Sequence, residues 1–162
     1  MSANKSRPHL VILPEDRQNE QIANGFHLEV GRLRQLQVLP VAGGWKKVLE
    51  DFLSTHVAEM RRYSTRFMVL LFDCDNDPDR LRTARQDVPQ DLRDRVFLIG
   101  VLTEPEDLRV DLGSAEVIGA ALAGDCREGT TRAWGHRLLK HNVNEIDRLR
   151  PQICPILFPA SH

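Results

Sequence analysis

The stretch "RFMVLLFDCDNDPDR", residues 66–80, joins an apolar run to a dense cluster of acids. The run from Phe67 to Phe72 is continuously apolar, which is typical of a short strand buried on both faces. Four acids follow at every second position: Asp73, Asp75, Asp77 and Asp79. Neighbouring buried carboxylates raise each other's pKa unless a cation neutralises them. The stretch therefore predicts a strand that ends at a charged, functional loop.

Working outward, four further segments have the character of strands. They are "HLVILP" (9–14), "RLRQLQVLP" (32–40), "RVFLIGVL" (95–102) and a final short run, "CPILF" (154–158). The intervening segments predict helices at 15–28, 44–63, 78–88, 114–126 and 134–153. Strands that alternate with helices indicate a three-layer, Rossmann-like α/β fold with a mainly parallel sheet.

Length and composition indicate one domain. The chain has 162 residues, of which 41% are hydrophobic and 28% charged. We expect a single α/β domain over residues 1–162, with a motif-bearing core at 8–110 and a helical C-terminal extension at 111–162. The net charge of -1 excludes a globally basic nucleic-acid binder but leaves room for local arginine clusters. Without a long apolar stretch or the apolar core of a signal peptide, we expect no contact with membranes.

The three cysteines are Cys74, Cys126 and Cys154. They are odd in number, far apart in sequence, and contain no CxxC pair. This usage argues against both a disulfide framework and a structural zinc site. It favours a protein of the reducing cytoplasm.

Acids follow three of the predicted strands. Glu15 and Asp16 follow the first, Asp73 and Asp75 follow residues 66–72, and a further pair, Glu104 and Glu106, follows residues 95–102. In α/β sheets, ligands bind at the carboxyl ends of the strands. Several carboxylate oxygens together suit Mg²⁺ or Mn²⁺. Helix capping is the competing interpretation, and it is the stronger one for Asp16, Asp77 and Asp79.

Three known motifs fit the acid-rich stretch poorly. An EF-hand loop starting at Asp73 requires Gly and Glu where the chain has Pro78 and Ala84. A haloacid-dehalogenase-like phosphatase usually has Thr or Val at the position of Asp77, and its motif lies on the first strand. A response-regulator receiver needs a lysine at a later strand end, which "FLIGVLTEPE" (97–106) lacks.

The chain resembles the Toprim fold, the metal-binding catalytic domain of topoisomerases, primases and nucleases of the overcoming-lysogenization-defect type. The matching segments are "VILPEDRQNEQI" (11–22), "VLLFDCDND" (69–77) and, more loosely, "FLIGVLTEPEDL" (97–108). The resemblance implies that Glu15 acts as general acid or base and that Asp73 and Asp75 bind the metal. It also implies further acids in the metal site: Glu20 on the first helix, and Glu104 or Glu106 after a later strand.

One departure from the Toprim pattern lies next to Glu15. Toprim sequences usually have Gly there, and this chain has Asp16. The topoisomerase and primase branches also need additional domains, so the resemblance implies a nuclease, or the catalytic subunit of a larger complex, in a bacterial defence or DNA-processing setting. It implies nucleic acid as substrate, DNA before RNA, an ATPase partner subunit and a possible homodimer.

Four basic residues are candidates for contacts with nucleic acid. The residues expected to contact nucleic-acid phosphates are Arg62, Arg80, Arg82 and Lys140. For each of them a solvated helix face is the competing interpretation.

Two other function classes remain as alternatives to a nuclease. They are a non-catalytic α/β interaction module and a phosphotransfer or phosphatase-type enzyme that uses Asp73 as nucleophile.

The C-terminal segment "RAWGHRLLKHN" (132–142) concentrates Trp134, His136, His141 and Asn142. These side chains are suited to a substrate pocket or to stacking on a base. Packing of Trp134 in the core and structural hydrogen bonds from His141 and Asn142 are the favoured alternative. His136 and His141 are five residues apart, so they would not share one face of a helix.

Overall fold

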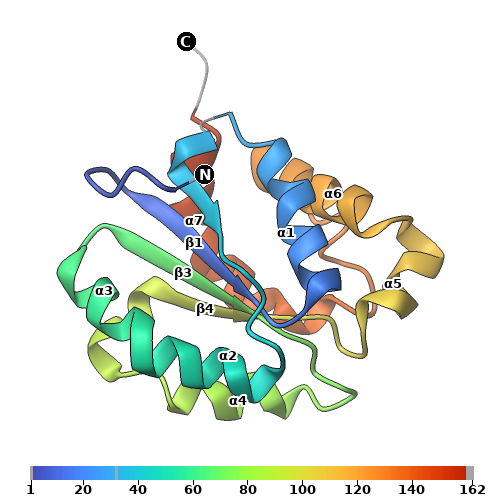
Figure 1. Ribbon diagram of the computed structural model, residues 1–162. Helices are drawn as coiled ribbons and strands as arrows, with labels where there is room; N and C mark the ends of the chain where they lie inside the picture. The colour runs from blue at the N-terminus through green and yellow to red at the C-terminus, as the bar shows by residue number, and fades with distance from the viewer. Residues whose placement is uncertain (1, 32, 160–162) are drawn as a thin grey trace.

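Four parallel strands form a single sheet in the computed structural model, which describes residues 2–31 and 33–159 (Figure 1). The strands are β1 (His9–Pro14), β2 (Leu36–Val38), β3 (Arg66–Leu71) and β4 (Val96–Ile99), arranged in the order β2-β1-β3-β4. Helices cover both faces of the sheet. The three-layer α/β fold with a mainly parallel sheet is thereby confirmed.

The two central strands fix the position of the candidate site. β1 pairs with β3 from His9 opposite Arg66 to Pro14 opposite Leu71. Because both strands run in the same direction and end level with each other, the residues that follow them leave the sheet at the same edge. Glu15 and Asp73 are thus brought together from positions 58 residues apart.

One face of the sheet is covered by helices from the middle of the chain. They are α2 (Trp45–Asp51), the π-helical turn η2 (Phe52–His56), α3 (Val57–Arg62) and α4 (Asp79–Gln86). The first three follow one another without a break, as the predicted helix at 44–63 requires. Inward-facing residues of alternate strand positions, such as Val11, Met68 and Leu98, pack against these helices in one apolar cluster.

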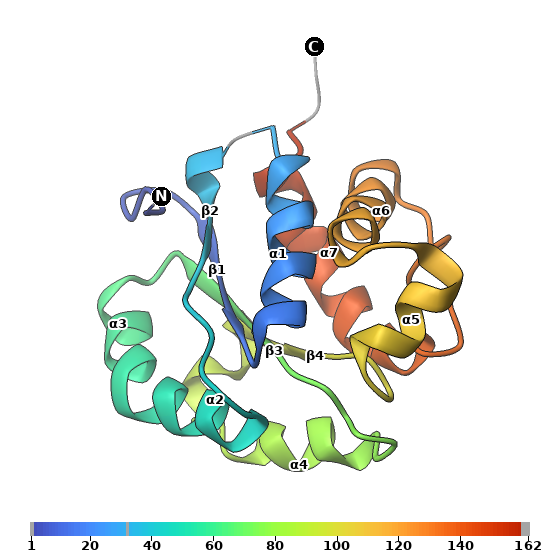
Figure 2. The same cartoon turned by 45° about the vertical axis from the view of Figure 1, so that its right-hand side comes forward.

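The other face is covered by α1 (Arg17–Leu28), α6 (Ala115–Glu128) and α7 (Val143–Leu157), while α5 (Pro105–Leu112) lies beside α6 (Figures 1 and 2). Leu10, Val69 and Phe97 face this second core. Helices α1 and α6 approach closely because Gly25 and Gly119 face the backbone of the opposite helix. Three short 3₁₀ turns complete the structure: η1 (Leu33–Gln35), η3 (Gln90–Arg95) and η4 (Lys140–Asn142).

Three secondary-structure predictions are wrong or incomplete. Residues 154–158 do not form a strand, because α7 continues to Leu157 and buries apolar side chains of that run, including Cys154 and Leu157, in the second core. The helix predicted at 134–153 begins only at Val143. The residues before it form turns that Asp125 fixes by accepting three backbone hydrogen bonds. Helix α5 was not predicted.

The prediction that the cysteines form no disulfide is also wrong. Cys126 at the end of α6 and Cys154 in α7 are joined by a disulfide across 28 residues of sequence. Both cysteines lie on helix faces that pack in the second core, so the two sulfur atoms meet through tertiary packing. Cys74 is a buried free thiol.

Candidate metal centre

Three carboxylates converge where β1 and β3 end. Oxygen atoms of Glu15, Asp16 and Asp73 all lie within 4.8 Å of one another. Glu15 Oε1 accepts a hydrogen bond of 2.8 Å from the backbone N–H of Asp73. This bond connects the two strand ends directly and fixes one carboxylate against the backbone of the next. Glu15, predicted as the catalytic acid or base, and Asp73, predicted as a metal ligand, therefore lie together, and Asp16 joins them.

Asp16 has two functions in this arrangement. It is the N-cap of α1, and its Oδ1 accepts a hydrogen bond of 3.0 Å from the backbone N–H of Asn19. The helix-capping interpretation of Asp16 is thus confirmed. The same carboxylate also belongs to the three-acid group.

Asn19, which no sequence pattern indicated, holds two of the acids in place. Its side chain is fully buried. Its amide nitrogen donates to Asp16 Oδ1 at 3.0 Å and to Asp73 Oδ1 at 3.1 Å. Its own amide oxygen is buried without a hydrogen-bond partner among the described residues. The amide nitrogen of Asn19 thus faces the two carboxylates and fixes their positions, and the possible ligand atoms are the oxygens of the three acids.

Burial and the neighbouring acids raise the pKa values of two carboxyl groups in the site. Burial raises the pKa of Asp73 to about 7, with Glu15 and Asp16 adding to the rise and the Asn19 hydrogen bond opposing it. Burial also raises the pKa of Glu15, against the lowering effect of the Asp73 N–H. A divalent cation would offset the mutual repulsion of these carboxylates and favour their ionised forms. The donor chemistry thus fits a divalent metal ion held by Asp16 and Asp73, with the Glu15 carboxylate beside it.

Arg80 is the cation next to this group. It donates a hydrogen bond of 3.0 Å from Nη1 to the backbone carbonyl of Asp73, and its Nη2 lies 3.8 Å from Asp75 Oδ2. The guanidinium also lies 4.6 Å from the ring centroid of Trp45, at the start of α2. These contacts fix Arg80 at the border of the site, where its charge can meet a bound anion.

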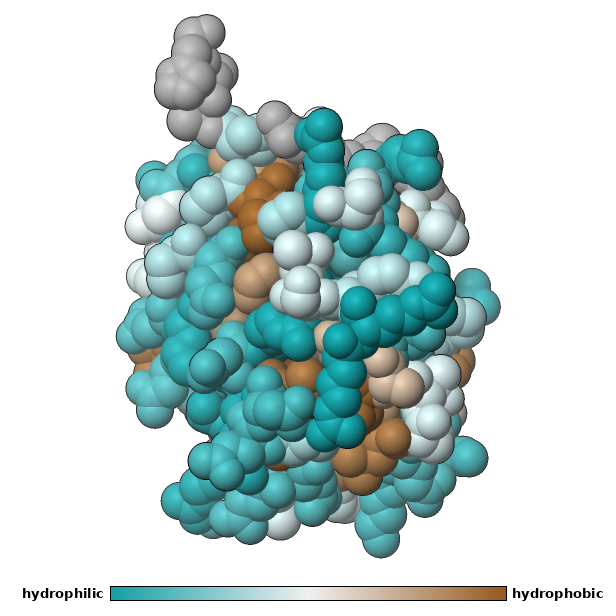
Figure 3. All heavy atoms as spheres, turned by 90° about the vertical axis from the view of Figure 1, so that its left-hand side faces the viewer, coloured by the Kyte–Doolittle hydropathy of each residue, from teal (hydrophilic) through white to brown (hydrophobic). Residues whose placement is uncertain are grey.

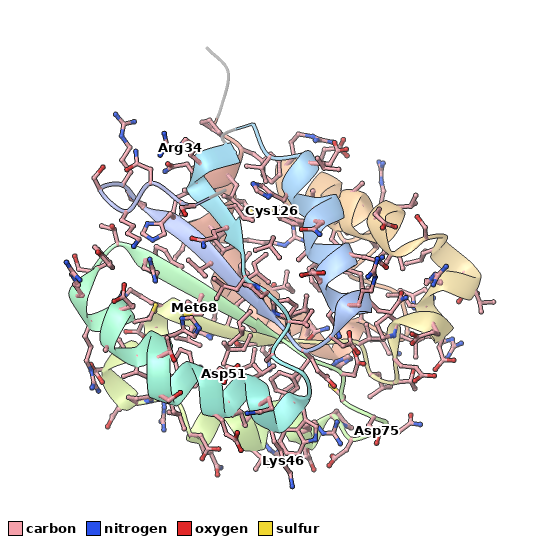
Figure 4. All side chains as sticks on the ribbon, in the orientation of Figure 1. Arg34, Lys46, Asp51, Met68, Asp75 and Cys126 are labelled. Carbon is pink, nitrogen blue, oxygen red and sulfur yellow. A yellow bond between two sulfur atoms is a disulfide. The ribbon has the colours of Figure 1, made fainter. Side chains whose placement is uncertain are left out.

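Asp75, predicted as a metal ligand, is not part of the three-acid group. It and Asn76 have positive φ angles of 51° and 63°. Two backbone hydrogen bonds tie this loop to the segment after β4, from Cys74 N–H to Val101 and from Asn76 N–H to Leu102. With 85% of its side chain exposed, Asp75 lies at the carboxyl edge of the sheet, next to solvent (Figure 4).

The other predicted acids surround the group without joining it. Glu104 is the N-terminal flanking residue of α5 and is exposed, and Glu106 lies in the first turn of that helix. The charge of Glu106 raises the pKa of Glu104, followed by smaller effects that include Asp75 and Asp16. Glu20 lies in the first turn of α1. The edge of the sheet is therefore acidic well beyond the three converging carboxylates.

The predicted phosphate-binding residues are dispersed. Arg80 borders the site, as described above. Arg82 is exposed and ion-paired with Asp79 at 2.8 Å, and Lys140 is exposed in η4. Arg62 ends α3, which precedes β3, so it lies at the opposite, amino edge of the sheet from Asp73.

The aromatic and polar residues of the segment 132–142 make contacts that stabilise the fold. Asn142 is buried and forms a pair of hydrogen bonds with the backbone of Gly100, at 3.1 and 2.9 Å. His136 Nε2 lies 2.7 Å from Asp111, and Trp134 packs against the apolar clusters. These contacts agree with packing and hydrogen bonding, the alternative that the sequence favoured.

Cys74 and His141 form a separate contact near the site. His141 Nε2 lies 3.6 Å from the Cys74 sulfur. Burial raises the pKa of the Cys74 thiol to about 12, so it remains protonated near neutral pH. The pair therefore lacks the thiolate that nucleophilic catalysis by cysteine requires.

Comparison of this chain with models of protein families, with curated proteins and with solved structures finds no match. The class that the structure defines is an α/β domain with a parallel sheet and an acidic strand-end site. Among the described residues, no helix has both the length and the apolar character needed to cross a membrane.

Proposed function

We propose that this chain is a nuclease of Toprim type that hydrolyses phosphodiester bonds with Mg²⁺ or Mn²⁺. The observation that carries the proposal is the meeting of Glu15, Asp16 and Asp73 at the ends of two adjacent parallel strands. The raised pKa of the buried Asp73 supports it, because a carboxyl group perturbed by burial and by neighbouring acids is typical of a functional site.

Each residue of the site has a role in this proposal. Asp16 and Asp73 would hold the ion, and Asn19 orients both of their carboxylates through its amide nitrogen. Glu15, whose pKa is raised by burial, moves a proton to or from the attacking or leaving oxygen. Arg80 meets a phosphate oxygen at the border of the site. When bound, the ion supplies charge neutralisation at the phosphate and activation of water.

The partners and the compartment belong to the same proposal. We infer DNA in preference to RNA as the substrate, an ATPase partner subunit, a possible homodimer and a cytoplasmic location. The disulfide between Cys126 and Cys154 argues against the cytoplasmic location, because reducing compartments keep most thiols reduced. Differential alkylation of the two cysteines in cells tests it, since a cytoplasmic chain should carry them mainly as free thiols.

Cleavage assays test the activity. Plasmid, linear duplex, single-stranded DNA and RNA are incubated with the wild type, Asp73→Asn, Glu15→Gln and, as a matched control, Asp94→Asn, which alters an exposed acid in η3. We expect cleavage that requires Mg²⁺ or Mn²⁺, is lost in the two site variants and persists in the control. Cleavage that survives Asp73→Asn would contradict the site assignment.

The same variants separate the nuclease from the two other function classes. A phosphotransfer enzyme would form an acyl phosphate on Asp73, detected as a phosphate label that alkali or hydroxylamine removes, and would depend on Glu15 far less. An interaction module would show neither cleavage nor labelling and would tolerate all of the substitutions. The nuclease requires Glu15 and Asp73 together.

A further inference from the structure

Positive charge gathers around one tyrosine at the amino edge of the sheet, opposite the acids. Lys5 Nζ lies 5.1 Å from the ring centroid of Tyr63, and the guanidinium carbons of Arg62 and Arg66 each lie 5.2 Å from it. An aromatic ring has two faces, so three cations at this range cannot each be stabilised fully by the ring. The ring therefore does not offset all of the repulsion between the three positive charges.

Arg66 is the buried member of this group of three cations. Only 5% of the residue is exposed, and its Nε donates a hydrogen bond of 3.1 Å to Nε2 of His9, its partner across β1 and β3. Nδ1 of His9 lies 2.7 Å from the carbonyl oxygen of Arg7 and therefore carries the proton, which leaves Nε2 as an acceptor. Among the described residues, the two terminal nitrogens of Arg66 have no hydrogen-bond acceptor.

No carboxylate neutralises the cluster at close range. Within the described ranges, none lies within 4.0 Å of the charged nitrogens of Lys5, Arg62 or Arg66. Glu59 acts on Arg66 only at longer range. By contrast Arg61, the neighbour of Arg62, is paired with Asp91 through two bonds of 3.1 Å. The face that carries α3 and the N-terminal segment is largely covered by hydrophilic side chains (Figure 3).

We propose that Lys5, Arg62 and Arg66 form an anchoring site for the phosphodiester backbone of nucleic acid, remote from the acidic centre. A phosphate can accept hydrogen bonds from the unused nitrogens of Arg66 while Lys5 and Arg62 approach it from the surface. The cluster is local, so it is compatible with a net charge of -1 for the whole chain. The identity of the ligand rests on the proposed nuclease function.

The two sites are joined by one continuous helical segment, Trp45–Arg62. Trp45 contacts Arg80 beside the acids, and Arg62 ends in the cationic cluster. Eighteen residues at 1.5 Å each span ~27 Å. At 3.4 Å per step along a strand of duplex, that length corresponds to about eight base pairs. A nucleic acid that lies along this helix would reach the acids with one end and the cluster with the other.

Binding in the presence of EDTA tests the anchor separately from cleavage. The probes are a fluorescein-labelled single strand of about 20 nucleotides and its duplex, followed by anisotropy at several salt concentrations. The Lys5→Gln/Arg62→Gln variant is compared with Arg61→Gln, which removes the same kind of charge from the neighbouring, paired arginine. Both residues of the test variant are exposed, so the fold should be retained, and circular dichroism verifies it.

We expect the double variant to reduce the slope of log affinity against log salt by about 1.4 on the single strand and about 1.8 on the duplex. At ~0.1 M salt this corresponds to a loss of affinity of about 25-fold to 60-fold. Arg61→Gln should change the affinity less than threefold, because the charge of Arg61 is exposed and already paired with Asp91.

The outcomes separate this inference from the proposed function. Unchanged binding by the double variant, an equal loss in Arg61→Gln, or no binding by the wild type would overturn the anchor. Cleavage with unchanged binding in the double variant contradicts the anchor alone. Binding that behaves as expected, in a wild type that never cleaves with Mg²⁺ or Mn²⁺, supports the anchor and contradicts the nuclease.

Discussion

The Asp73→Asn substitution should stabilise the metal-free protein at alkaline pH. Burial raises the pKa of Asp73 from 3.8 to about 7, so the folded protein prefers the protonated acid. An acid whose pKa is higher in the folded state loses stability as the pH rises from the unfolded to the folded value, here from 3.8 to about 7. The shift corresponds to ~4 kcal/mol at full weight, and solvent screening of this partly exposed group reduces it to about 2 kcal/mol.

Urea denaturation in EDTA measures this effect. The free energy of unfolding is determined for the wild type and Asp73→Asn at several pH values between about 4 and 8. The difference between the two proteins should change by about 2 kcal/mol across this range, in favour of the variant at high pH. Taking the difference cancels the histidines, which are common to both proteins. Of these, His9, His56 and His141 have pKa values lowered by burial and titrate in the opposite sense.

Divalent metal should reverse the order of stability. At about pH 8, adding Mg²⁺ or Mn²⁺ at 100 times its dissociation constant stabilises the wild type by ~2.7 kcal/mol and should leave Asp73→Asn nearly unchanged. The reasoning would be refuted by a variant that is less stable than the wild type at every pH in EDTA. It would equally be refuted by metal that stabilises both proteins to the same extent, because the ion would then bind elsewhere.

Three further variants test the fold by urea denaturation. Removing the disulfide with Cys126→Ser/Cys154→Ser should cost about 3.5 kcal/mol for a loop of 28 residues, and an equal stability of oxidised and reduced wild type would contradict this. Asn142→Ala leaves both backbone groups of Gly100 unpaired in the core and should cost about 3 kcal/mol, whereas a cost below ~1 kcal/mol would mean that water replaces the amide. Gly119→Ala places a methyl group against the backbone of α1 and should cost about 3 kcal/mol, with Gly124→Ala, which meets only the end of an arginine side chain, as the control.

The fold was predictable where burial dominates the sequence. The strands at 9–14, 66–71 and 96–99 lie between two layers of helices, so they are apolar apart from His9 and Arg66 at their first positions and are recognised from that run alone. The same criterion fails for residues 154–158, because a short apolar run is equally compatible with the buried end of a helix. That segment lies in α7 despite Pro151 and Pro155, and only its packing in the second core distinguishes the two possibilities.

The start of α7 and the disulfide depend on contacts between distant residues. The turns before Val143 form because the buried Asp125 carboxylate accepts the N–H groups of residues 132–134, a partner that local periodicity does not reveal. The two cysteines of the disulfide lie on different helices, α6 and α7, and are brought together by the packing of these helices. Sequence spacing contains neither piece of information.

The candidate site was predictable in its centre and not at its border. Glu15 and Asp73 followed from the rule that adjacent parallel strands deliver their carboxyl ends to one edge. Asp75 was predicted to be a ligand at the same edge. Its backbone has a positive φ, and its side chain is exposed to solvent instead of joining the three acids. Asn19 lies three residues after Asp16 on the first turn of α1. That spacing from an N-cap acid is the only sequence signal that could have indicated it.

Charge is segregated along the direction of the strands. Every strand of the sheet points the same way, so its carboxyl edge collects the acids that follow β1, β3 and β4, while Arg66 at the start of β3 and the residues before β1 place cations at the amino edge. The net charge of -1 for the whole chain is compatible with these two local groups of opposite sign. A polyanion that approaches this molecule is attracted to the amino edge and repelled from the carboxyl edge until a divalent cation neutralises the acids there. On this argument metal should affect cleavage far more than the initial binding, because the cationic cluster is complete without it.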